Sequence, residues 1–308
     1  MTRRPRVARL RQARTVRPVR RRSARPSPAR AAAALVALGA AATLYGLAGS
    51  PAFGVERVVV DGARLTSRTA IEVALGLDRG TSVFGLAVDG LEDRLRNLPA
   101  VAAARVRVVL PDTVAVEIVE RRPILAWRVG DDLYLVDGEG VLVARVPVPG
   151  PRPSASPGPG EPADLPVTLR LDDAILPVVD DRRTSGRPFV LGASLGAVEL
   201  DAARRLGSLR PVDVGSAAPE LRVALDDADG WTIRPTGGGG EGPSWVAVFG
   251  VYTPTLRPTT MIPGQVRLLR SLLRDREPAV ERVVLASETD GTYVPRPSPG
   301  TGEGRTSP

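Results

Sequence analysis

Few side chains in this 308-residue chain could do covalent chemistry. Residues 192–196 (GASLG) match the G-x-S-x-G pattern, in which the central serine attacks an ester or amide. Ser194 would need a histidine or a lysine to accept its proton, and the chain contains neither residue type. The chain also contains no cysteine, which excludes disulfides, thiolate nucleophiles and cysteine-ligated zinc. The pattern therefore predicts a glycine-rich loop and no catalytic serine.

Two further stretches resemble ligand-binding loops but lack the residues that such loops need. Residues 237–240 are consecutive glycines, yet a phosphate-binding loop also requires a lysine. Residues 226–230 (DDADG) resemble part of a calcium loop, but the register puts Leu225 at the first ligand position and Thr236 at the twelfth. We predict a polar hairpin turn here. We expect no catalytic residue, no metal, no cofactor and no small-molecule substrate, so the chain is not expected to be an enzyme.

Positive charge is concentrated at the N-terminus. Residues 1–30 hold 12 of the 42 arginines and no acidic residue. With four prolines and no aromatic residue, this segment is predicted to be a disordered cytoplasmic tail. Arginine runs can bind nucleic acid, bind anionic lipid, or fix the orientation of a membrane segment. The segment that follows favours the last interpretation, and no nucleic acid partner is expected.

An apolar run without charge begins at Ala31 and ends at Gly49. A helix of this length spans about 28 Å at about 1.5 Å per residue, close to the thickness of the bilayer core. We predict a single transmembrane helix over residues 31–51, with the lipid bilayer as its partner. The arginine-rich flank places the N-terminus in the cytoplasm and the later residues outside it. The alternative is a signal peptide that is cleaved near the small residues 48–50.

A small domain with the element order β-α-α-β-β is predicted next. Residues 55–61 are valine-rich and indicate a strand that ends at an Asp-Gly turn. Two short helices are expected: one follows an N-cap at Thr66 or Ser67, and a second follows Asp89. Phe84, in the loop between them, is expected to fill the core.

Two alternating strands complete this domain. Residues 102–110 and 114–119 alternate apolar and polar side chains across a tight turn, as in a half-buried antiparallel hairpin. We expect a three-stranded sheet with both helices on one face. Glu120 and Arg121, at the end of the last strand, are interpreted as structural residues.

Three runs in this region resemble the FtsQ/DivIB family of cell-division proteins: "FGVERVVVDGARLTSRTAIEVALGL", "LRNLPAVAAARVRVVLPDTVAVEIVERRPILAW" and "LYLVDGEGVLV". The resemblance extends over residues 31–143. It implies an α+β fold with a transmembrane helix, a POTRA domain at residues 53–122 and a β-rich domain with flanking helices at residues 123–294.

The β-rich part is less regular in sequence. A proline-rich insertion is expected at about 146–166 and a disordered tail at 295–308. A hairpin around Asp137-Gly138 is predicted within 133–143. Helices and strands are then expected at residues 196–209, 220–225, 231–234, 245–252, 265–274 and 280–286.

The resemblance also implies a function. It indicates a non-catalytic membrane scaffold of the bacterial divisome, located in the plasma (inner) membrane at the septum, that binds FtsB or the FtsB–FtsL pair during septum formation. In such proteins a partner strand adds to an open sheet edge. By analogy we assign partner binding to the last strand of the β domain, with the candidate residues Val280, Arg282, Val284, Ala286 and Tyr293.

Two other functions remain open from the sequence. A POTRA domain also occurs in envelope transport and assembly components. Cleavage after the apolar run would instead release a secreted binding protein.

Overall fold

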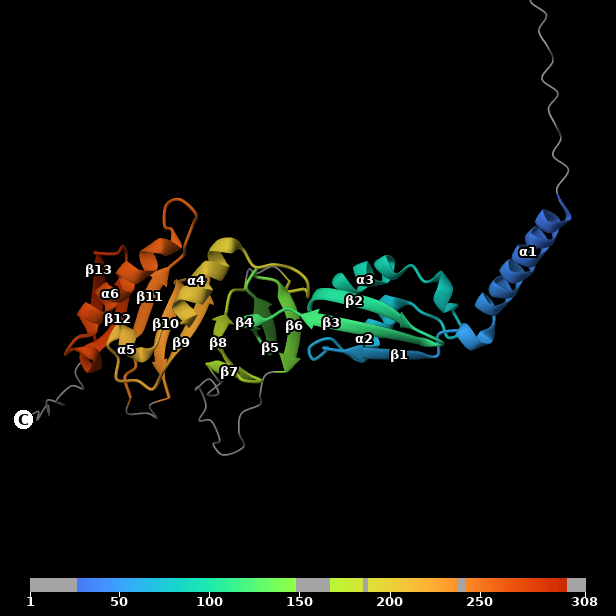
Figure 1. Ribbon diagram of the computed structural model, residues 1–308. Coiled ribbons are helices and arrows are strands. Elements are labelled where there is room, and N and C mark those ends of the chain that lie inside the picture. The colour runs from blue at the N-terminus through green and yellow to red at the C-terminus, as the bar shows by residue number, and fades with distance from the viewer. Residues whose placement is uncertain (1–26, 148–166, 185–187, 238–241, 298–308) are drawn as a thin grey trace, which may run out of the picture.

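A computed structural model describes residues 27–147, 167–184, 188–237 and 242–297. The chain runs from an isolated helix through a small α/β domain to a large sheet that carries helices (Figure 1). This arrangement confirms the predicted α+β class. The predicted tails at 1–30 and 295–308 and the insertion at 146–166 lie almost entirely outside the described residues.

The first helix, α1, spans Pro28–Ala48. Its alanines and leucines favour a helix, and Pro28 stands at the first helical position, where proline is tolerated. Within the described residues it is the one helix long and apolar enough to cross a membrane, with a mean hydropathy of 1.4 over Pro28–Gly46. It starts and ends three residues before the predicted 31–51. The short turn η1 (Pro51–Phe53), capped by the Ser50 hydroxyl, accounts for the earlier end.

The small domain has the predicted order of elements. The strands β1 (Arg57–Asp61), β2 (Val101–Val109) and β3 (Thr113–Glu120) form a sheet in the order β1-β3-β2. The helices α2 (Arg68–Leu75) and α3 (Val88–Arg96) cover it. β1 runs parallel to β3, and β2 and β3 form the predicted antiparallel hairpin.

Helix caps in this domain follow the local sequence only in part. The Ser67 hydroxyl accepts the Ala70 N–H at 3.2 Å, and Gly76 ends α2 with a φ of 56°. Asp89 does not cap α3, because the helix begins at Val88 and Asp89 lies within its first turn, where a carboxylate favours the helix dipole.

The residue that fills the core from the loop before α3 is Val83, not Phe84. Val83 is 4% exposed, whereas Phe84 is 55% exposed. The turn η2 (Val83–Gly85) directs the two neighbouring side chains to different sides. Phe84 lies instead against Phe53, with ring centroids 5.1 Å apart.

Glu120 and Arg121 both make the structural contacts expected of them: Glu120 holds a loop of the small domain, and Arg121 joins this domain to the next. The Glu120 carboxylate accepts the backbone N–H groups of residues 64–66 at 2.7–3.0 Å. Arg121 pairs with Asp137 at 2.8 Å and with Glu139 at 2.9 Å, both of which belong to the second domain.

The second domain is built on a ten-stranded sheet of order β13-β12-β11-β10-β9-β8-β4-β5-β6, with β7 paired to β8. Its strands are β4 (Pro123–Val129), β5 (Asp132–Asp137), β6 (Leu142–Pro147), β7 (Thr168–Leu171), β8 (Ala174–Asp181), β9 (Glu220–Asp226), β10 (Gly230–Thr236), β11 (Val246–Gly250), β12 (Val280–Leu285) and β13 (Gly291–Pro295). Four of these, β4, β7, β8 and β13, were not predicted.

Helices α4 (Ala197–Gly207), α5 (Pro211–Val214) and α6 (Ile262–Leu273) lie on one face of this sheet (Figure 1). They enclose the main core, which includes Trp127, Trp245 and Phe249, each 0% exposed. Such large buried side chains contribute about 3–5 kcal/mol each against truncation to alanine. This core keeps the sheet, and therefore its edge, in one conformation.

The three chemistry-like motifs are structural where they are described. The GASLG loop packs on the β5–β6 hairpin, with the Leu142 N–H donating to the Ala193 carbonyl at 2.9 Å. Residues 226–230 form the predicted hairpin turn, in which the Asp226 carboxylate accepts the Ala228 and Asp229 N–H groups. Residues 238–240 of the glycine run lie outside the described residues. Among the described residues, no group of three potential ligands is placed to hold a metal ion.

Candidate partner-binding edge

The last strand of the large sheet is β13, not β12 as predicted, and β13 forms one edge of the sheet while β6 forms the other. β12 is paired on both sides: it is parallel to β11 and antiparallel to β13. The prediction went wrong because residues 287–291 reverse the chain. The Ser287 hydroxyl accepts the Thr289 and Asp290 N–H groups, and the Ser287 N–H donates to the Asp290 carbonyl at 2.9 Å.

Hydrogen-bonding capacity is unused along β13. The Arg296 N–H donates to the Ala279 carbonyl at 2.8 Å, so this amide faces the β12 side. Amides alternate in direction along an antiparallel strand, which turns the N–H groups of Gly291 and Tyr293 away from β12. Pro295 falls in the same outward set, where its missing N–H removes no bond to β12. β13 can therefore accept another strand.

The exposed side chains at this edge are mixed in character. Tyr293 is 41% exposed and Val294 47%, and Val284 on the neighbouring strand is 36% exposed. Val294 lies opposite Arg282, and Thr292 lies opposite Val284, so these four share the face away from α6. Tyr293 lies opposite the buried Val283, on the helix side. A partner strand would thus meet apolar side chains on both faces.

The candidate residues named from the sequence differ in their availability. Val280 is fully buried, so its side chain belongs to the core. Arg282 is half-buried and pairs with Asp229 of the β9–β10 turn. Ala286 is exposed but follows the end of β12. Of the five candidates, only Val284 and Tyr293 are exposed and lie within β12 or β13.

Two side chains fix the end of β12: the half-buried Arg257 and the fully buried Gln265. The Arg257 guanidinium donates to the Leu285 carbonyl at 2.5 Å and to the Ala286 carbonyl at 2.7 Å. The Gln265 amide donates to the same Leu285 carbonyl at 3.1 Å, and its oxygen accepts the Tyr252 hydroxyl at 2.6 Å. Burial raises the pKa of the Tyr252 phenol above its ordinary value, so this hydroxyl stays a donor.

Glu277 fixes the start of β12. Its carboxylate is 8% exposed and accepts the Trp245 indole N–H at 2.7 Å, the Ser216 hydroxyl at 2.5 Å and the Ala217 N–H at 2.9 Å. Three donors satisfy a buried charge that would otherwise be costly. Neither Glu277 nor Arg257 was predicted, because the contacts by which they hold β12 in place join residues at least 28 positions apart in sequence.

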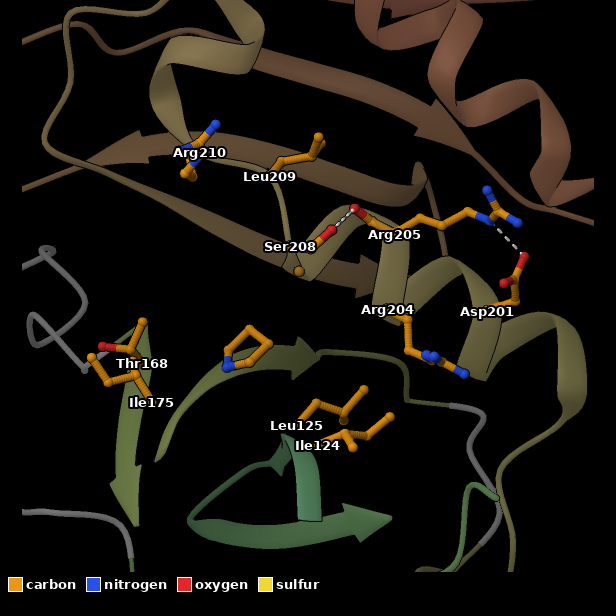
Figure 2. A pocket seen from close by; sticks show the side chains of 12 residues that line it. Ile124, Leu125, Thr168, Ile175, Asp201, Arg204, Arg205, Ser208, Leu209 and Arg210 are labelled. Carbon is orange, nitrogen blue, oxygen red and sulfur yellow. Dashed lines mark hydrogen bonds and ion pairs between the residues drawn. The ribbon is translucent and has the colours of Figure 1, made fainter. Parts of the chain in front are cut away.

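A groove of about 800 Å³ lies on the other half of the sheet, between the end of α4 and strands β4, β7 and β8 (Figure 2). Its floor is apolar, with Ile124, Leu125 and Ile175, and arginines of α4 form its rim. The Ser208 hydroxyl donates to the backbone carbonyl of Arg205, so this serine satisfies a carbonyl at the end of α4. The groove thus offers a surface for binding, not a nucleophile.

One carboxylate at this groove is held ionised. Asp201 accepts from Arg205 at 2.8 Å and from the Thr259 hydroxyl at 2.5 Å. Burial acts to raise the pKa of Asp201, but the hydrogen bonds from Arg205 and Thr259 outweigh it and lower the pKa below its ordinary value.

Known proteins resemble this chain most clearly in its first domain. Residues 53–121 match the family model described as a POTRA domain, FtsQ-type. The chain is a relative of the FtsQ cell-division proteins. It is 37% identical over 183 residues to cell division protein FtsQ of Jannaschia sp., which covers 58% of this chain and 56% of that protein. It is 30% identical over 181 residues to that of Cereibacter sphaeroides, covering 58% and 57%.

A shorter match reaches cell division protein FtsQ of Mycobacteroides abscessus, at 34% identity over 100 residues and 32% of each chain. The chain thus spans between about a third and somewhat more than half the length of these relatives. The FtsQ-type POTRA domain and its N-terminal apolar helix confirm the resemblance drawn from the sequence, and they support a role in cell division.

Proposed function

We propose that this chain is a non-catalytic membrane scaffold of the division machinery. α1 anchors it in the plasma membrane with the N-terminus in the cytoplasm, and the POTRA and β domains lie outside at the septum. The observation that carries the proposal is the free β13 edge on a rigid sheet, in a chain related to FtsQ.

The partner is a membrane-anchored division protein of the FtsB or FtsL type. One extended segment of it adds to β13 as an antiparallel or parallel strand, and main-chain hydrogen bonds to Gly291 and Tyr293 supply much of the affinity. Apolar partner side chains then cover Val284 and Val294, which are exposed without a partner. Pairing of this kind also removes the aggregation hazard of an open edge.

Two variants at one position test this mode of binding. Tyr293→Pro removes an outward N–H without touching a bond to β12, whereas Tyr293→Ala keeps that N–H and removes only the ring. Pull-down of the FtsB-type partner with the full chain should fall by at least about tenfold with proline and less with alanine. Equal recovery with Tyr293→Pro and the unmodified chain would refute strand addition at β13. Deleting 276–308 is a poorer test, because it also removes the core residues Val280 and Val283.

A depletion strain tests the cellular role. Loss of the chain should produce filaments, and a fluorescent fusion should collect at mid-cell. Normal septation, or association with an outer-membrane barrel, would favour an envelope transport or assembly role instead. A mature N-terminus near residue 50 would show that the protein is cleaved and secreted.

A further inference from the structure

The end of the POTRA domain next to α1 carries apolar side chains that the core does not use. Phe84 is 55% exposed, Val109 50% and Leu110 58%. They come from two different loops, the turn η2 before α3 and the turn between β2 and β3. Both loops lie at the end of the domain that α1 enters (Figure 1).

The loop with Phe84 is held firmly beside the chain that leaves α1. The Val55 N–H donates to the Thr81 carbonyl at 2.9 Å, and the Gly80 N–H donates to the Val55 carbonyl at 3.0 Å. A Cβ on Gly54 would come within 2.8 Å of the Gly80 Cα, so this close approach needs glycine. Phe84 is therefore presented outward by a fixed loop.

The β2–β3 turn is tied to the same place. The Glu56 N–H donates to the Asp112 carbonyl at 2.9 Å, and Arg57 pairs with the Asp112 carboxylate at 2.8 Å. The ion pair neutralises two charges beside Leu110. The tip of the turn is thus an apolar surface whose nearest charges compensate each other.

Chain length keeps this surface near the membrane. Only four residues, 49–52, separate the end of α1 at Ala48 from Phe53, and these five residue-to-residue steps bound the reach at about 17 Å for an extended chain. The 3₁₀ turn η1 shortens that reach further, because it rises only about 2 Å per residue. The polar layer of a bilayer is about 5–8 Å thick on each side. Phenylalanine and leucine side chains on interfacial surfaces bury about 5–10 Å into the boundary between headgroups and acyl chains.

We propose that Phe84 and Leu110 insert into the interfacial layer of the bilayer that α1 spans, on its extracytoplasmic side. These two contacts, in addition to α1, hold the POTRA domain on the bilayer and restrict its rotation about the segment that follows α1. The inference rests on the anchoring role proposed for α1. The occupant is lipid, because the surface adjoins the anchor and is apolar and charge-compensated.

Single spin labels test the proposal in the full chain, which has no native cysteine. Gly85→Cys and Val109→Cys place nitroxides next to Phe84 and Leu110 and leave both residues intact. A Cβ on Gly85 meets no atom within 4 Å, so the label fits there. Val119→Cys, at the far end of β3 and 62% exposed, is the water control, and Leu38→Cys in α1 is the lipid control. The protein is reconstituted in phosphatidylglycerol–phosphatidylethanolamine nanodiscs.

The expected result is low accessibility to a water-soluble nickel chelate and high accessibility to oxygen at both test sites. Nickel accessibility should be several-fold below that at Val119, and Phe84→Ser or Leu110→Ser should restore it at the adjacent label. The proposal is overturned if nickel accessibility at either test site equals that at Val119 while the Leu38 label lies in lipid. That result would leave the anchoring role of α1 intact. Low accessibility to both reagents means cover by protein and also overturns it. A Leu38 label that is open to nickel refutes the anchor itself.

Discussion

Glu277 is a buried carboxylate just before β12 that accepts three hydrogen bonds. Replacement by alanine leaves the Trp245 indole, the Ser216 hydroxyl and the Ala217 N–H without their buried acceptor. Each lost bond to a charged group costs about 1.5–3 kcal/mol, and the effects are not additive. We expect Glu277→Ala to lower the free energy of unfolding by about 3–4 kcal/mol.

Urea unfolding followed by tryptophan fluorescence measures this loss. All three tryptophans lie in the β domain, so the signal reports that domain alone. Glu281→Ala is the matched control, since Glu281 lies four residues away on β12 and is exposed. It should change stability by less than about 0.5 kcal/mol. Equal effects of the two substitutions would show that the buried hydrogen bonds of Glu277 do not stabilise the edge.

Asp201 gives the β domain a defined dependence on acid. Its pKa in the folded protein is lower than its value in the unfolded chain, about 3.9. Its contribution to stability is therefore complete above the unfolded pKa and is lost as the pH falls through the folded pKa. The difference in Tm between the natural chain and Asp201→Asn should be present at pH 7 and should shrink steadily below about pH 5.

Thermal unfolding at several pH values checks this dependence. Asp173→Asn, an exposed carboxylate elsewhere in the β domain, serves as the control. A difference in Tm that stays constant down to pH 2 would contradict the assignment of the acid dependence to Asp201.

At the scale of elements, neighbouring residues in the η2 loop have opposite roles. Val83 fills the POTRA core, so Val83→Ala should cost about 2 kcal/mol of POTRA stability through the cavity it leaves. Phe84→Ala should cost little, because the ring is mostly exposed. Amide hydrogen exchange of β3 measures both in the full chain. A larger loss for Phe84→Ala would mean that the ring supports the core after all.

The POTRA elements were predictable because short-range signals fix them. Ser67 and Gly76 delimit α2, and alternation between 102 and 119 fixes the hairpin. The mistake at Phe84 has a simple cause: size suggested a core residue, but the backbone turn decides which neighbour faces inward. Sequence periodicity carries no information on such a turn.

The β domain was less predictable for a different reason. β12 shows a clear valine pattern, whereas β13 is five residues long and includes a glycine and a proline, which disfavour strands. Pairing with β12 outweighs that preference. β4 and β8 are paired in parallel across some fifty residues, and no local signal specifies such a register. The sequence therefore led us to take β12 as the last strand of the sheet, whereas β13 lies beyond it.

At the scale of the whole molecule, the anchor and the binding edge lie at opposite ends (Figure 1). Contacts between the two domains hold them against each other. Leu65 and Ala100 pack into a cluster with β-domain residues, and Arg64 pairs with Asp172 at 2.9 Å. If a partner binds at β13 as proposed, the POTRA domain sets its distance from the bilayer. Docking of the POTRA domain on lipid would fix that distance.

Hydrogen exchange at β13 tests the central claim most directly. The full chain is reconstituted with and without the proposed FtsB-type partner, and exchange of the Gly291 and Tyr293 amides is compared. Strand addition predicts at least about tenfold slower exchange at both amides in the complex, with little change in β2. A complex that forms while these two amides exchange at their free rates would contradict the account.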